Sequence, residues 1–127
     1  MKSVVFILVF LIFKNLGFAA NDRQIILLEI KNRANEKYEI TQTYSQKYLL
    51  IKRIDNQSTQ SELQKPTVDN LELKCIKAYK KMYVNYPGGC EKAWQSKLTV
   101  SDLTYYACKN DQYAQTLMDG LKRRLSP

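Results

Sequence analysis

The chain has 127 residues, of which 20 are Lys or Arg and 12 are Asp or Glu, so its formal net charge is +8 at pH 7. It contains no histidine, which excludes Ser-His and Cys-His catalytic pairs, imidazole bases and the commonest metal ligand of proteins. A chain of this length is sufficient for one domain with a modest core.

The first 20 residues have the pattern of an export signal. Lys2 precedes a run of ten apolar residues, Val4–Phe13, and two alanines close the segment. The apolar run stops at Lys14, well short of the ~20 residues that cross a bilayer, so we expect a cleaved signal peptide and no membrane-spanning segment in the mature chain. Residues 21–127 then form a single secreted, extracellular domain with 18 basic and 12 acidic residues, a net charge of +6.

The first part of that domain predicts helix. Residues 21–54 contain neither Gly nor Pro, and several of their apolar residues recur at spacings of three or four, which favours one long helix or two shorter ones. Tyr38–Tyr44 alternates polar and apolar residues and is rich in β-formers, so a strand there is the alternative. Residues 55–66 are polar and predict a loop, within which Asn56-Gln57-Ser58 is the one N-glycosylation sequon. Asn56 either carries a sugar or lies in an unmodified, solvated loop.

The clearest helical pattern covers Asp69–Asn85. An apolar stripe at spacings of three and four is formed by Val68, Leu71, Cys75, Tyr79, Met82 and Tyr86. Lys74, Lys77 and Lys81 form a basic row on the opposite face. The turn Pro87-Gly88-Gly89 then ends the helix, because proline cannot continue it and glycine accepts backbone angles closed to other residues.

The remaining residues predict a helical hairpin, against which Trp94 is expected to pack. Glu91–Leu98 is expected to form a short helix, and Thr99, with Asp102 three residues later, is the expected N-cap of a last helix over Val100–Leu125. Lys122, Arg123 and Arg124 lie near its end, where cations are favoured. The predicted fold is therefore all-α: a small helical bundle of about three long helices plus a short helix, with one disulfide.

Three cysteines allow one disulfide and leave one thiol over. Cys90 and Cys108 lie at equal distances from Thr99, so the predicted hairpin brings them to the same height and favours their pairing; a Cys75–Cys108 bond ranks second. Cys75 lies in the middle of an apolar stripe, which is typical of a buried free cysteine. An unpaired cysteine also allows a covalent dimer, so Cys75 is a free or interchain thiol.

No catalytic motif accompanies this pattern: the chain has no Gly-rich phosphate loop, no Gly-x-Ser-x-Gly elbow and no clustered metal ligands. We therefore expect a secreted non-enzymatic protein, without a cofactor or a metal, that acts by binding another macromolecule, as in extracellular signalling or in glandular, reproductive or venom-type secretions.

The alternative is an extracellular helical carrier of a small hydrophobic ligand, because tyrosines and Met82 could line a cavity between helices. Small size, export and the predicted helical build loosely resemble insect odorant-binding proteins, whose six-cysteine framework is absent here.

The expected partner is a protein or a glycan and not a nucleic acid, which an exported protein rarely meets. The lysine row at 74, 77 and 81 and the cluster Lys122–Arg124 are the candidate anion-binding residues. The plainer interpretation of such a row is an ordinary solvated helix face, since lysine usually stays exposed.

Overall fold

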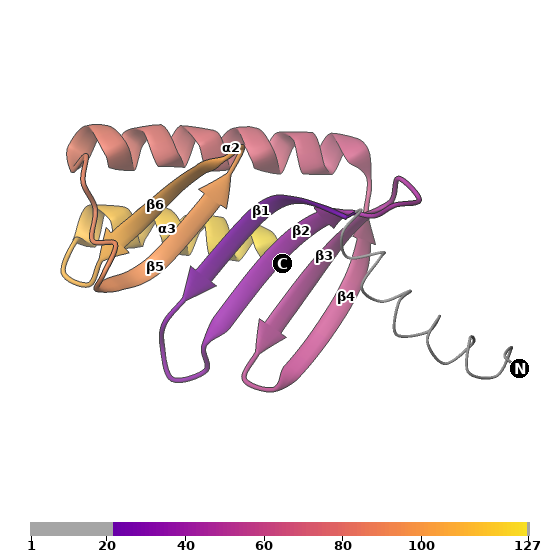
Figure 1. Cartoon of the computed structure of the whole chain (residues 1–127), viewed down its shortest axis with the longest axis horizontal. Coiled ribbons are helices and arrows are strands. Elements are labelled where there is room, and N and C mark those ends of the chain that lie inside the picture. The colour runs from indigo at the N-terminus through magenta and orange to yellow at the C-terminus, as the bar shows by residue number, and fades with distance from the viewer. Residues whose placement is uncertain (1–21, 127) are drawn as a thin grey trace, which may run out of the picture.

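The computed structural model describes residues 22–126, so the predicted export signal at 1–20 lies outside the described residues. The chain forms a six-stranded antiparallel sheet with two helices packed against one face (Figure 1). Across the sheet the strand order is β4-β3-β2-β1-β5-β6. In chain order the elements are β1 (Arg23–Ile30), β2 (Glu36–Gln42), β3 (Tyr48–Ile54), β4 (Gln57–Leu63), α2 (Lys65–Asn85), β5 (Trp94–Val100), β6 (Leu103–Cys108) and α3 (Gln112–Leu125).

The all-helical prediction is therefore wrong. Residues 21–54 contain three strands, and the loop predicted at 55–66 contains β4 and the start of α2. The segments predicted as helices at 91–98 and 100–125 include β5 and β6, and only the second half of the latter segment is helical, as α3. Thr99 lies inside β5 instead of capping a helix. The strand alternative for Tyr38–Tyr44 is confirmed by β2. The helix predicted at Asp69–Asn85 is also confirmed, and it begins earlier because Pro66 is well tolerated in a first turn.

Two of the hairpins turn without glycine. Glycine is the usual sequence signal of a tight hairpin, so these turns were not predicted. Asp55-Asn56 joins β3 to β4 and Ser101-Asp102 joins β5 to β6, each as a two-residue connection between paired strand ends. Such short hairpin connections need positive φ, which Asn and Asp tolerate better than most residues with a side chain. Among residues 22–126, the non-glycine residues with positive φ are Asn35, Gln46, Asp55, Ser101 and Asp102.

The core lies between the helices and one face of the sheet. A row of side chains in register crosses four strands, from Tyr38 through Leu28 and Leu98 to Tyr105. All four side chains are buried, and their alternate neighbours point to the other face because side chains alternate along a strand. The helices complete this core with Val68, Leu71, Cys75, Ala78 and Met82 from α2 and Ala114, Met118, Leu121 and Leu125 from α3.

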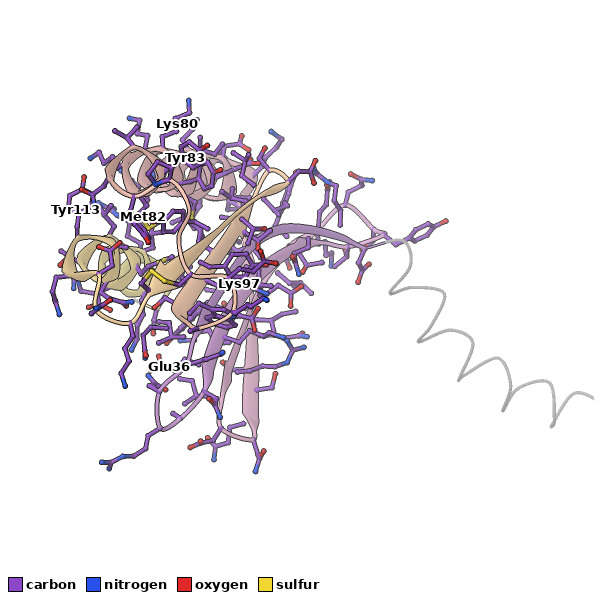
Figure 2. All side chains as sticks on the ribbon, turned by 60° about the vertical axis from the view of Figure 1, so that its left-hand side comes forward. Glu36, Lys80, Met82, Tyr83, Lys97 and Tyr113 are labelled. Carbon is purple, nitrogen blue, oxygen red and sulfur yellow. A yellow bond between two sulfur atoms is a disulfide. The ribbon has the colours of Figure 1, made fainter. Side chains whose placement is uncertain are left out.

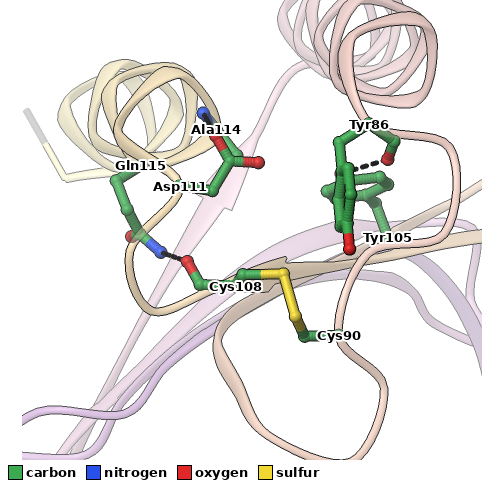
Figure 3. Close-up of a disulfide and its surroundings, with 7 residues drawn as sticks. All are labelled: Tyr86, Cys90, Tyr105, Cys108, Asp111, Ala114 and Gln115. Carbon is green, nitrogen blue, oxygen red and sulfur yellow. Dashed lines mark hydrogen bonds between the residues drawn. A yellow bond between two sulfur atoms is a disulfide. The ribbon is translucent and has the colours of Figure 1, made fainter.

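The predicted disulfide between Cys90 and Cys108 is confirmed, although on a different scaffold (Figure 3). Cys108 ends β6, and the segment after α2 returns along the free edge of that strand, where the Cys90 N–H donates to the Tyr106 carbonyl over 2.8 Å. The two Cα atoms are 5.0 Å apart. Cys75 is the free cysteine and is buried in the core, so its sulfur is not available to a second chain in the folded state.

Trp94 does not pack inside a helical hairpin, because it lies in β5 on the face of the sheet that the helices do not cover. It is half-buried there, 6.3 Å from Tyr106 between ring centroids, and the Lys31 ammonium lies 4.0 Å from its ring centroid. A cation over an aromatic face is a stabilising contact, so Trp94 is held as part of the sheet surface.

Candidate functional site: a basic groove between the helices

A groove runs between the antiparallel helices α2 and α3. Its hollow has a volume of about 270 Å³ and is lined by Lys74, Lys77, Ala78, Lys81, Thr116, Leu117, Gly120, Leu121 and Arg124. Toward the end of α2 it adjoins a second hollow of about 450 Å³, lined by Lys80, Lys81, Val84, Asn85 and Tyr113. Lys81 belongs to both hollows, so they form one continuous surface, which we call the α2–α3 groove.

The helical repeat places these side chains along the groove. In α2 the residues that point to the sheet are buried. The lysines at 74, 77 and 81 were predicted on the opposite face, but they lie beside that stripe, on the flank that meets α3. Ala78, Leu117 and Leu121 give the groove an apolar floor, while the cations stand at its rims. Figure 2 shows Lys80 on the outside of α2 and Met82 pointing inward from the same helix.

The cations of the groove have no acidic partner in the part of the chain that the structure describes. Within residues 22–126 the ion pairs join Arg53 to Glu39, Lys65 to Asp69, Lys97 to Glu29 and Lys122 to Glu36. None of these pairs includes a cation of the α2–α3 groove: Lys74, Lys77, Lys80, Lys81 or Arg124. Their charges therefore remain available to an anion from outside the protein.

The acidic residues of the two helices lie on other flanks. At about 100° per residue, Glu72 lies about 160° around α2 from Lys74, and Asp119 lies about 140° around α3 from Arg124. Asp69 is paired with Lys65, with 3.0 Å between the nitrogen and the oxygen. The groove is therefore positive along its whole length, because neither helix turns a carboxylate toward it.

The structure brings together four of the six predicted anion-binding residues. Lys74, Lys77 and Lys81 face Arg124 across the groove. Arg123 lies beside it, since its Nη2 is 3.9 Å from where a β-carbon on Gly120 would stand. Lys122 points elsewhere. Lys80 lines the groove but was not among the predicted anion-binding residues. The sequence could have indicated it, because Lys80 precedes Lys81 near the end of the same amphipathic helix.

Lys122 is bound to a buried carboxylate. Its Nζ lies 2.8 Å from Oε1 and 3.0 Å from Oε2 of Glu36, and Tyr38 and Asn32 also donate to that carboxylate. Burial favours a raised pKa for Glu36, but the hydrogen bonds from Lys122, Tyr38 and Asn32 outweigh it and hold the pKa below its ordinary value. The pair joins α3 to the β1–β2 hairpin, so Lys122 has a structural role and is not free to bind an anion.

The other predicted features fall outside the groove. Asn56 is exposed in the turn between β3 and β4, where a sugar would extend into solvent. No group of three or more His, Cys, Asp or Glu side chains in residues 22–126 is placed to hold a metal ion. Neither helix of that part of the chain combines the length and the apolar composition needed to cross a bilayer.

Comparison of the chain with models of protein families, with curated protein sequences and with solved structures finds no match.

Proposed function

We propose that this protein is exported and binds an acidic polysaccharide along the α2–α3 groove, without catalysing a reaction. One observation carries the proposal: five cations that form no ion pair with any described residue surround one groove, and the carboxylates of both helices lie elsewhere. Net charge alone would support a diffuse attraction, whereas a concave arrangement of unpaired cations supports a defined site.

The dimensions of the groove favour a linear polyanion. Lys74 and Lys81 are seven residues apart, about 10 Å along the helix axis at 1.5 Å per residue, with Arg124 on the opposite rim. Sulfate or carboxylate groups repeated along a sugar chain can contact several of these cations together. The apolar floor at Ala78, Leu117 and Leu121 suits the C–H faces of sugar rings.

Two features support export to an oxidising compartment. The N-terminal pattern of a basic residue, ten apolar residues and small residues is typical of a signal peptide. The Cys90–Cys108 disulfide is of a kind that persists outside the cytosol and is rare within it. An extracellular protein meets acidic polysaccharides on cell surfaces and in matrices, which agrees with the proposed ligand.

The carrier hypothesis has less support. A carrier of small hydrophobic ligands needs an enclosed apolar cavity. The hollow beside Val84 and Tyr113 has a mainly apolar lining, but it is open to solvent and is bordered by Lys80 and Lys81. That surface suits an anionic ligand with an apolar face better than a buried lipid.

The test compares binding to heparin with binding to a simple sulfopropyl resin. In one variant Lys74, Lys77 and Lys81 are changed to Gln, which removes three charges and retains good helix propensity. Exposed ion pairs contribute about 0.2–1 kcal/mol each, so we expect the loss of three to cost about 0.6–3 kcal/mol, which is roughly a 3- to 150-fold rise in the Kd for heparin.

The matched control changes Lys47, Lys92 and Lys109 to Gln. These lysines are also exposed, and they lie in loops away from the groove. We expect both triple variants to elute equally early from the sulfopropyl resin, and only the groove variant to lose most of its retention on heparin. Equal losses on heparin would show that net charge, and not the groove, determines binding.

A further inference from the structure

The two edges of the sheet differ in their protection. Beside β6, the segment after α2 covers the edge: the Cys90 N–H bonds to Tyr106, and the disulfide to Cys108 holds the segment in place. Beside β4, no described segment pairs with the outer edge, because β4 ends the strand order and its hydrogen-bonded neighbour is β3. The backbone groups of β4 that point away from β3 are therefore open to another strand.

β4 has only one of the features that usually block edge pairing, the charge of Glu62. Its sequence, Gln-Ser-Thr-Gln-Ser-Glu-Leu, has no proline and no lysine, and its register with β3 runs without a bulge from Ile54–Gln57 to Tyr48–Leu63. All of its residues are exposed except Leu63, which is half-buried. Monomeric proteins commonly protect an edge with a charge, a proline or a bulge, so this regular seven-residue edge is suited to pairing.

The β4 sequence is complementary to itself when two copies run antiparallel about Gln60. This register uses all seven residues, with Gln60 opposite Gln60 and Thr59 opposite Ser61. It places Glu62, the one charged residue of the strand, opposite Ser58 of the second copy. Sliding the strands to oppose Glu62 with Glu62 would place like charges together and would also shorten the ladder.

The ladder ends with the strand at both ends, because Asp55 lies in the turn from β3 and Lys65 begins α2, where it pairs with Asp69. Asn56 precedes the strand, so a sugar on it would stand at the end of the ladder and not along it. Symmetric pairing of one surface with itself is the commonest way in which soluble proteins form dimers.

We propose that two copies of this protein associate through their β4 edges, antiparallel and centred on Gln60, into one continuous sheet. The inference does not depend on the proposed polysaccharide binding, because β4 and the α2–α3 groove share no residue. A single edge contact is small compared with a standard interface, so we expect a Kd of about the micromolar to millimolar range.

Sedimentation equilibrium from about 10 μM to about 1 mM tests this proposal over that range. Gln60→Lys and Gln60→Glu each place two like charges at the centre of the ladder, so we expect each variant alone to raise the dimer Kd at least about tenfold. An equimolar mixture of the two variants should dimerise again, because the introduced ammonium of one copy would then oppose the introduced carboxylate of the other. Gln112→Lys, which adds the same charge on the exposed start of α3, should leave the Kd unchanged.

Restored association of the mixture would establish that the β4 edges pair and that Gln60 opposes Gln60. Variants that were merely destabilised would not regain dimerisation when mixed. The proposal is overturned if the unmodified protein stays monomeric throughout the range. It is also overturned if a dimer forms but is insensitive to Gln60→Lys, since another surface would then join the copies.

Discussion

At the scale of single residues, Gly89 is the described glycine that leaves the least room for a side chain. Its φ is +59°, and a β-carbon there would stand 2.5 Å from the Tyr106 carbonyl oxygen, which accepts the hydrogen bond from Cys90. We expect Gly89→Ala to lower the free energy of unfolding by about 2 kcal/mol or more, through backbone strain and the loss of this contact.

The neighbouring Gly88 is the control for this measurement. A β-carbon on Gly88 would meet nothing within 4 Å, so Gly88→Ala should change the stability much less. Chemical denaturation of both variants measures the difference. Similar losses for the two substitutions would mean that the segment after α2 does not lie against β6 as described.

The buried carboxylate of Glu36 predicts a dependence of stability on pH. Because the hydrogen bonds from Lys122, Tyr38 and Asn32 hold its pKa below the ordinary value, the folded state favours the ionised form. This stabilisation is present above the pKa of Glu36 in the unfolded chain and is lost as the pH falls through the lower pKa of the folded state.

Glu36→Gln should therefore cost about 1–3 kcal/mol near neutral pH, in line with hydrogen bonds to charged groups. The difference in unfolding free energy between the unmodified protein and this variant should shrink as the pH falls below about 4.5. Glu62→Gln on the exposed edge is the control and should change the stability near neutral pH much less. A Glu36→Gln difference that stays constant down to pH ~2 would contradict the ionised pair.

At the scale of elements, the disulfide joins the segment after α2 to the end of β6. The surroundings are held by further bonds: the Tyr105 hydroxyl donates to the Tyr86 carbonyl over 2.6 Å, and Gln115 Nε2 donates to the Cys108 carbonyl over 3.0 Å (Figure 3). These contacts tie the end of α2 and the start of α3 to the same strand.

Replacing Cys90 and Cys108 by Ser should lower the free energy of unfolding by about 3 kcal/mol, the value expected when a loop of this length is no longer closed in the unfolded chain. Thermal or chemical unfolding measures this loss. Reduction of the unmodified protein should have the same effect. A loss well below about 1 kcal/mol would show that the hydrogen bonds alone hold the segment on β6.

An element could be predicted from the sequence where its pattern of apolar residues fits only one type of secondary structure. The stripe containing Val68, Cys75 and Met82 predicts α2 correctly, because it repeats over several turns beside a row of lysines. Apart from Tyr38–Tyr44, where a strand was the alternative, the strands were not predicted. Edge strand β4 is polar on both faces and resembles a loop, whereas Ser96, Leu98 and Val100 alternate in β5 and were a usable signal.

The candidate site could be predicted only in part, for a similar reason. The lysine row at 74, 77 and 81 follows from the helical repeat of one element. That Arg124 faces this row, and that Lys122 leaves it to bind Glu36, depends on how α3 packs against α2 and the sheet. The disulfide was predicted from spacing alone, and the spacing suits a strand and a returning segment as well as two helices.

At the scale of the whole molecule, the open face of the sheet and the helix layer differ in the pairing of their cations. On the face of the sheet away from the helices, Lys97 is paired with Glu29 at 3.0 Å and Arg53 with Glu39 at 3.4 Å. On the helix layer, the cations of the α2–α3 groove have no such partners among the described residues. The cations gathered along the groove therefore give the helix layer a concentration of unpaired positive charge.

Nuclear magnetic resonance titration with a heparin tetrasaccharide, at low salt, tests the central claim most directly. Binding along the α2–α3 groove should shift the amide and lysine side-chain signals of residues 74–81 and 116–124, and added salt should reverse these shifts because exposed charges are screened. The signals of Arg53 and Lys97 on the opposite face should not move. Equal shifts on both faces, or none at residues 74–81, would contradict the account.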